Sequence, residues 1–95
     1  MNRESFTQSL HDGKFNEALE KSLEAGAHNA AHSHEFDVRA LVTQGDISLT
    51  IESVTTRYSE GEIFTMVAGC THEENVGAQG VTYLVGRRYV GADDT

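Results

Sequence analysis

The sequence contains no proline, no tryptophan and a single cysteine, Cys70, among its 95 residues. One cysteine excludes a disulfide within the chain, so a reducing compartment, the cytoplasm, is the expected location. In place of proline the chain has nine glycines. This composition is typical of short strands joined by tight turns.

Positive charge is also scarce, with seven basic residues against 15 acidic ones and a formal net charge of −8. An acidic chain without a basic stripe is unsuited to a phosphate backbone, so we expect no nucleic-acid partner. No apolar run approaches the roughly 20 residues that span a bilayer. The N-terminal stretch MNRESFTQSL lacks the apolar core of a signal peptide, so we expect no membrane partner either.

The length fits one domain with one core. Near the N-terminus, Phe6 and Leu10 lie four positions apart, which predicts a short helix over about residues 4–12. The pair Asp12-Gly13 then marks a turn.

Residues 15–24 are ambiguous. Their composition favours a helix, while the alternating positions from Phe15 to Leu23 fit one face of a strand. Local propensity alone favours the helix.

From Phe36 onward the pattern indicates β-structure. The segments VRALVTQ and DISLTIES flank Gly45, TTRYSEGE runs into a turn at Gly61, and IFTMV and GVTYLVGRR follow. Five or six short strands at regular spacing predict an antiparallel sandwich or barrel. The side chains expected in its interior are Phe64, Met66, Val42, Ala40, Leu49 and Tyr83.

Two histidines, His32 and His34, are separated by one residue. On an extended segment this spacing places both side chains on the same side, because side chains alternate between faces along a strand. That geometry suits a metal ion, although the pair alone does not establish one.

The spacing of His32 and His34 between Gly26 and Gly45 resembles the first sequence motif of the cupin superfamily. That motif reads Gly, five residues, His, one residue, His, three or four residues, Glu, six residues, Gly. A second cupin motif is matched by Gly61, Gly69 and His72 within GEIFTMVAGCTHEEN. Its proline position holds Val67, and its asparagine falls one place early, at Asn75.

The resemblance implies an all-β cupin jelly-roll barrel with a short N-terminal helix. It implies one domain over residues 1–95, with the barrel at about 15–88 and a C-terminal tail at 89–95. It also assigns residues 15–24 to the first barrel strand, because tertiary context overrides helix propensity.

The resemblance further implies that His32, His34 and His72 converge inside the barrel and bind one divalent transition metal, which could be Fe, Zn, Ni or Mn. The position of the motif's glutamate ligand holds Val38, which would leave a fourth coordination position open. The metal-free alternative is a scaffold that keeps three polar histidines in its pocket.

Five nearby residues are weaker candidates. Strand parity turns Asp37 and Glu35 away from the histidines, unless a β-bulge intervenes. We expect His28 in a rim loop and Cys70 in a structural turn, although either could contribute to the site. The hydroxyl of Tyr83 could reach a bound ligand while its ring packs.

The functional prediction is a three-histidine metalloenzyme acting on a small oxygen- or thiol-containing molecule, oxygenase-like or isomerase-like. A metal-dependent dioxygenase is one such enzyme. The alternative is a non-catalytic module that binds or senses a small molecule or metal. In either case we expect a homodimer, since small barrels leave sheet edges that profit from a partner.

Overall fold

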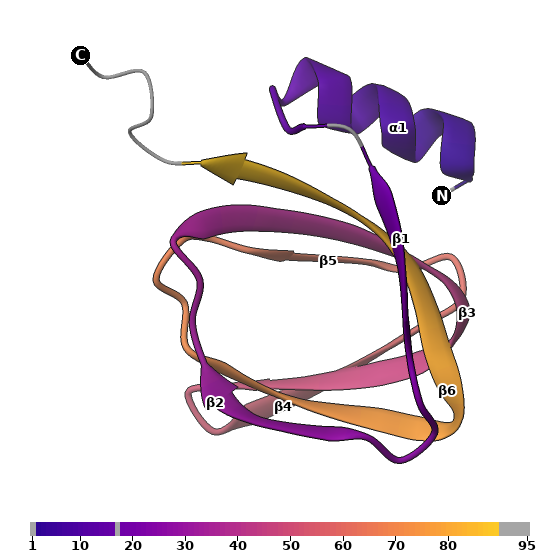
Figure 1. The fold of residues 1–95 in the computed structure, drawn as a ribbon, viewed down its shortest axis with the longest axis vertical. Helices are drawn as coiled ribbons and strands as arrows, with labels where there is room; N and C mark the ends of the chain where they lie inside the picture. The colour runs from indigo at the N-terminus through magenta and orange to yellow at the C-terminus, as the bar shows by residue number, and fades with distance from the viewer. Residues whose placement is uncertain (1, 17, 90–95) are drawn as a thin grey trace.

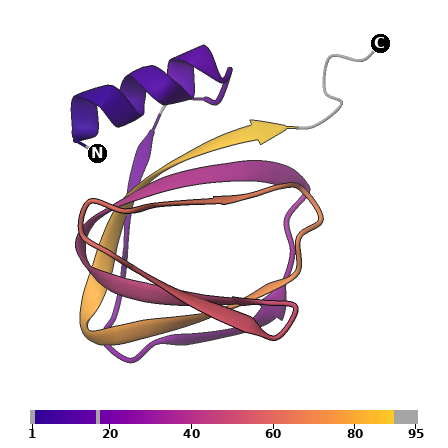
Figure 2. The ribbon, with the colours of Figure 1, turned by 180° about the vertical axis from the view of Figure 1, so that it is seen from behind.

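The computed structural model describes residues 2–16 and 18–89, which form a β-barrel with one helix outside it (Figures 1 and 2). Every strand pairing is antiparallel, so the all-β prediction is confirmed. In chain order the elements are α1 (Arg3–Asp12), β1 (Leu19–Leu23), β2 (His28–His32), β3 (Phe36–Ile51), β4 (Val54–Ser59), β5 (Ile63–Met66) and β6 (His72–Tyr89).

Two long strands, β3 and β6, pair with each other, and each of the other strands pairs with one of them. β6 pairs with β1, β2 and β3, while β3 also pairs with β4 and β5. The sequence predicted two strands where β3 is one, and it predicted a strand from Gly80 where β6 already starts at His72. The predicted break at Gly45 and the predicted strand start at Gly80 were both wrong.

The contact between Gly45 and Gly80 explains why β3 continues where the sequence indicates a turn. Both glycines have positive φ, +75° and +78°, and the β3–β6 register shifts on either side of Gly45. A Cβ on Gly45 would collide with the carbonyl oxygen of Gly80. The glycine therefore marks a bulge inside a bent strand, which keeps both halves of the strand facing the interior.

The segment over residues 15–24 is a strand, as the resemblance implied, but a shorter one. β1 spans Leu19–Leu23 and pairs with β6 from Val81 to Val85. Phe15 and Asn16 precede it, and Glu17 lies outside the described residues. Pairing with a long strand overrides the local preference for helix.

The barrel interior contains every side chain that the sequence placed there. Its buried residues are Val38, Ala40, Val42, Ile47, Leu49, Phe64, Met66, Val76, Val81, Tyr83 and Val85. Their even positions before the bend in β3 become odd positions after it, as the register shift requires.

Helix α1 covers the outside of the barrel (Figure 2). Phe6 and Leu10 are buried against Leu41 and Leu84, which alternate with the interior residues of β3 and β6. The side chain of Asn2 caps the helix by accepting a hydrogen bond from the Ser5 backbone. The predicted helix is confirmed.

The C-terminal tail was predicted to start at residue 89, but Tyr89 is the last residue of β6, and residues 90–95 lie outside the described part. Within the described ranges, no helix is both long and apolar enough to cross a membrane.

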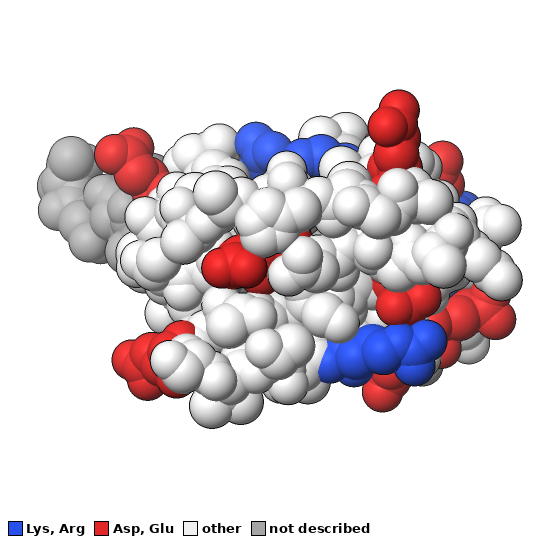
Figure 3. All heavy atoms as spheres, turned by 90° about the horizontal axis from the view of Figure 1, so that it is seen from below, with Lys and Arg blue, Asp and Glu red and all other residues white. Residues whose placement is uncertain are grey.

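On the face seen in Figure 3, acidic side chains are scattered and the basic ones form small groups. β1 and β4 lie at the ends of the main strand order. The homodimer stays a prediction.

Candidate metal and ligand site

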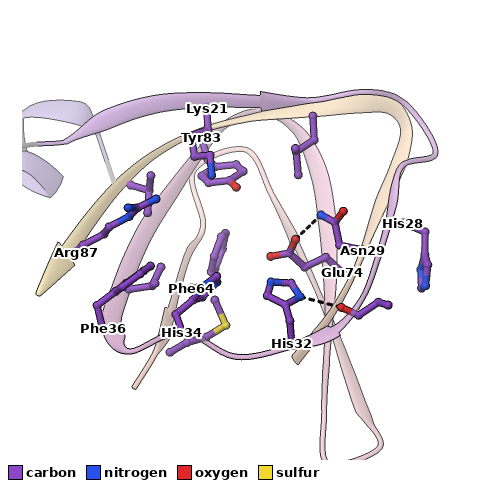
Figure 4. A pocket seen from close by; sticks show the side chains of 15 residues that line it. Lys21, His28, Asn29, His32, His34, Phe36, Phe64, Glu74, Tyr83 and Arg87 are labelled. Carbon is purple, nitrogen blue, oxygen red and sulfur yellow. Dashed lines mark hydrogen bonds between the residues drawn. The ribbon is translucent and has the colours of Figure 1, made fainter. Parts of the chain in front are cut away.

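A cavity of about 440 Å³ opens into the barrel interior, and His32 and His34 line one end of it (Figure 4). His72, which is buried, lies beside them. All strands but β4 contribute to the cavity wall. The lining residues are Lys21, Leu23, His28, Asn29, Ala30, His32, His34, Phe36, Val38, Phe64, Met66, Glu74, Tyr83, Val85 and Arg87.

One ring nitrogen from each of His32, His34 and His72 lies within 4.8 Å of the others. The rings of His32 and His72 are closest, with centroids 4.4 Å apart, because β2 and β6 pair these two residues directly. The sequence predicted that His34 shares a strand face with His32, and this prediction was wrong. His34 lies in the connection between β2 and β3, and its ring still reaches within 5.0 Å of the His32 ring.

Backbone hydrogen bonds select the tautomer of two of the rings. Nδ1 of His32 donates to the carbonyl of Ala30 at 2.8 Å, and Nδ1 of His72 donates to the carbonyl of Cys70 at 3.0 Å. Because a carbonyl can only accept, each Nδ1 carries a proton, so in the neutral form of each ring the lone pair is on Nε2. The Nε2 atom of His72 is buried and has no hydrogen-bond partner.

His34 is held by stacking rather than by a side-chain hydrogen bond. Its ring lies on that of Phe36, with centroids 4.8 Å apart and planes 15° from parallel. Its carbonyl accepts a hydrogen bond from the backbone of Gly69, which joins the two sequence motifs. Burial, and then the neighbouring His72 and His32, lower the pKa of His34. This favours the neutral imidazole that metals bind.

Glu74 is a site residue that the sequence analysis missed. Its side chain is buried, and one oxygen accepts a 2.6 Å hydrogen bond from the Asn29 amide. The other oxygen lies 3.5 Å from Nε2 of His72. The available signal was the two-residue spacing from His72, which puts both on one face of an extended strand. We missed it because HEENVGAQ is too polar to show apolar alternation.

Val38 lines the cavity, so the position of the motif's glutamate is apolar as predicted. Asp37 faces away from it, accepting hydrogen bonds from the Ala68 backbone and the Arg88 guanidinium. Glu35 is exposed. Neither acid belongs to the converging group, in agreement with strand parity.

Cys70 and His28 also remain outside that group. The Sγ atom of Cys70 is directed to the carbonyl of Thr71 at 4.0 Å. His28 starts β2 rather than lying in a loop, which corrects the prediction, and its Nδ1 contacts the amide oxygen of Asn75 at 2.8 Å. It is exposed at the rim of the cavity.

Tyr83 extends into the cavity from the side opposite the histidines, and its hydroxyl points toward Glu74 (Figure 4). Its ring packs edge-on against Phe64 at 5.7 Å. Burial and then the Glu74 charge raise the pKa of the phenol to about 12, although the positive charge of Arg87 acts in the opposite direction. The phenol is therefore protonated at neutral pH and can donate a hydrogen bond to a ligand.

Comparison with solved structures finds the same fold in several proteins. A protein of unknown function from Rhizobium leguminosarum matches with a TM-score of 0.73 and 18% identity, over 81% of this chain and 72% of that one. The Cnp3 cupin domain of Schizosaccharomyces pombe matches with a TM-score of 0.69 and 19% identity, over 77% of this chain and 55% of that one.

A cupin-2 domain protein from Shewanella frigidimarina matches with a TM-score of 0.65 and 14% identity, over 76% of this chain and 69% of that one. No protein-family model matches the sequence. The curated proteins give no match either. At these identities the likeness concerns the fold.

Proposed function

The chain has the cupin fold, and we propose that it holds one divalent transition metal through His32, His34 and His72. The observation that carries this proposal is the buried Nε2 of His72, which lacks a hydrogen-bond partner and belongs to a ring whose centroid lies 4.4 and 5.2 Å from those of the other two. A buried polar atom without a partner is costly, and a metal ion would satisfy it.

The donor set fits a cation. In their neutral forms His32 and His72 each present an Nε2 lone pair, and a carboxylate oxygen of Glu74 lies 3.5 Å from Nε2 of His72. Like-signed partial charges at such distances repel unless a positive charge lies among them. Imidazole suits Fe, Zn, Ni and Mn, so the donors do not select one metal.

We propose further that the site is catalytic and acts on a small oxygen- or thiol-containing molecule. When bound, the metal would supply a Lewis acid and open positions for substrate or dioxygen. Glu74 is placed to accept a proton from a ligand hydroxyl or thiol, and Tyr83 to donate a hydrogen bond. Apolar side chains such as Phe64 and Met66 line another part of the cavity.

The test begins with metal analysis of protein purified without a histidine tag. Anaerobic reconstitution with Fe(II) then precedes oxygen-consumption assays on thiols, diketones and phenolics. We expect about one metal per chain and turnover of at least one class. His11→Ala, on the exposed face of α1, is the matched control for loss of a histidine.

Each result has a distinct meaning. Metal retention without turnover on any substrate would support the non-catalytic binding module instead. Absence of metal uptake from Fe, Zn, Ni and Mn would overturn the metal site, and the His72–Glu74 contact would then be a proton-mediated pair.

A further inference from the structure

The cavity carries opposite charges on opposite sides. Glu74 lies beside the histidines, while Arg87 enters from the other side (Figure 4). Lys21 also lines the cavity and pairs across the strands with Tyr83. Both cations therefore lie away from the acid and leave a polar gap that a ligand could fill.

Arg87 is the arginine whose guanidinium forms no hydrogen bond or ion pair with any residue in the described ranges. Each of the other four has an oxygen partner, which is Glu20 for Arg3, Ser9 for Arg39, Asp46 for Arg57 and Asp37 for Arg88. In a chain of net charge −8, acidic partners are plentiful. An arginine that faces a cavity instead of an acid is suited to binding an anion.

The Phe36 ring holds the guanidinium in place. The central carbon of the Arg87 guanidinium lies 4.6 Å from the ring centroid, and the same ring stacks on His34 at 4.8 Å. Stacking engages the face of the guanidinium and leaves its N–H edge available to an acceptor. One aromatic side chain thus separates the cation from the histidine cluster, a distance that a small molecule can bridge.

We propose that the ligand of this cavity is a small carboxylate that also carries a hydroxyl, carbonyl or thiol donor. The carboxylate would pair with Arg87, assisted by Lys21, and the donor would lie at the histidines beside Glu74. Lys21 and Arg87 outnumber Glu74 by one charge, and a divalent metal would add more positive charge, so the cavity suits an anion. The placement of the donor at the histidines rests on the proposed function. The placement of the carboxylate rests on Arg87 and does not depend on the metal.

The experiment compares two ligands of the same shape, 3,4-dihydroxybenzoate and 3,4-dihydroxybenzamide, by isothermal titration calorimetry. Both offer the same pair of metal-binding oxygens, and they differ in one negative charge. The protein is titrated in its metal-loaded and metal-free forms, with wild-type, Arg87→Gln, Arg87→Lys and Lys21→Gln chains. Arg3→Gln is the matched control, since Arg3 is an exposed arginine on α1.

We expect metal-loaded wild type to bind the acid at least about tenfold more tightly than the amide, as hydrogen bonds to charged groups allow. Arg87→Gln should remove most of this preference without lowering metal content, Arg87→Lys should keep much of it, and Arg3→Gln should keep all of it. Lys21→Gln should reduce it a few-fold. Thermal unfolding of each variant checks that it is folded.

Equal affinity for acid and amide in the metal-loaded wild type, or no binding of either, would overturn the carboxylate inference and leave the metal site intact. An Arg87-dependent preference in a protein that takes up no metal would support the carboxylate site and overturn the metal site. A preference that survives in Arg87→Gln, or disappears equally in Arg3→Gln, would show that Arg87 is not the anchor.

Discussion

Nε2 of His72 and Oε2 of Glu74 lie 3.5 Å apart on the same face of β6. The Nδ1 atom of His72 donates to the Cys70 carbonyl, so in the neutral form of the ring Nε2 carries a lone pair. In that form a lone pair faces a carboxylate in a buried position, an arrangement that a cation stabilises. The remaining oxygen of Glu74 is fixed by Asn29, so the carboxylate cannot easily turn away.

Replacing Glu74 with glutamine should weaken metal binding by about 10–100-fold, the range seen when a group supporting a metal site is lost. The amide keeps the size of the side chain but removes its charge. Metal affinity is measured by competition with a chromogenic chelator. Glu73→Gln is the matched control, because Glu73 is the preceding residue on the other face of β6. Equal weakening in both variants would refute a specific role for Glu74.

Alanine at His32, His34 or His72 should lower metal affinity by more than that range, because each change removes a direct ligand. The barrel should remain folded, since the apolar cluster that fills its interior does not include these rings, and the largest loss of stability is expected at the fully buried His72. Metal content is measured by mass spectrometry of the purified protein, and folding by circular dichroism, with His11→Ala as the reference. Full metal content in all three variants would show that the ligand assignment is wrong.

The substitution Val38→Glu should tighten metal binding and suppress turnover that needs the open position. Val38 lines the cavity with the histidines, so a longer acidic side chain there would add a negative ligand. Chelator competition measures the first effect and oxygen consumption the second. Val38→Gln controls for size without charge. If the charged and neutral variants bind metal equally, the fourth position is not at Val38.

Gly45→Ala should lower the free energy of unfolding by at least about 2 kcal/mol, because an alanine there combines a left-handed backbone with a collision. The collision is with the Gly80 carbonyl, which the sheet holds in place. Gly26→Ala is the control, since Gly26 also has positive φ, +71°, but open space around a Cβ. Urea unfolding should show the smaller loss for Gly26→Ala. Equal losses would mean that strain alone matters.

The Asp37–Arg88 contact should make stability depend on pH in the acid range. The hydrogen bond from the Ala68 backbone, and then that from Arg88, lower the pKa of Asp37 from its ordinary 3.8. A lowered folded-state pKa contributes stability above pH 3.8, and this stability is lost as pH falls through the folded-state value. Asp37→Asn should remove this part of the acid dependence in urea unfolding. Glu60→Gln, in an exposed turn, should leave it unchanged.

The resemblance to the cupin motifs singled out His32, His34 and His72 from the sequence, because those motifs are spacing rules along the chain. The intervals from Gly26 to His34 and from Gly61 to His72 reflect turns and strand ends that local backbone geometry sets. The helix at Phe6 and Leu10 and the apolar interior positions follow in the same way, because each rests on a short period of its own segment.

Other features depend on residues that meet only in the folded barrel. The sequence around Gly45 predicts a turn, but in the barrel Gly45 packs against Gly80 within one continuous strand. Residues 15–24 favour a helix by composition, but pairing with β6 makes Leu19–Leu23 a strand. Glu74 and Arg87 stand at opposite sides of one cavity although both belong to β6, because the strand bends between them. The sequence by itself determined the spacing of the three histidines in their motifs and the identity of the core side chains. Only the tertiary structure decided how charge is arranged around the site, because bends and pairing between distant segments set which side chains share a cavity.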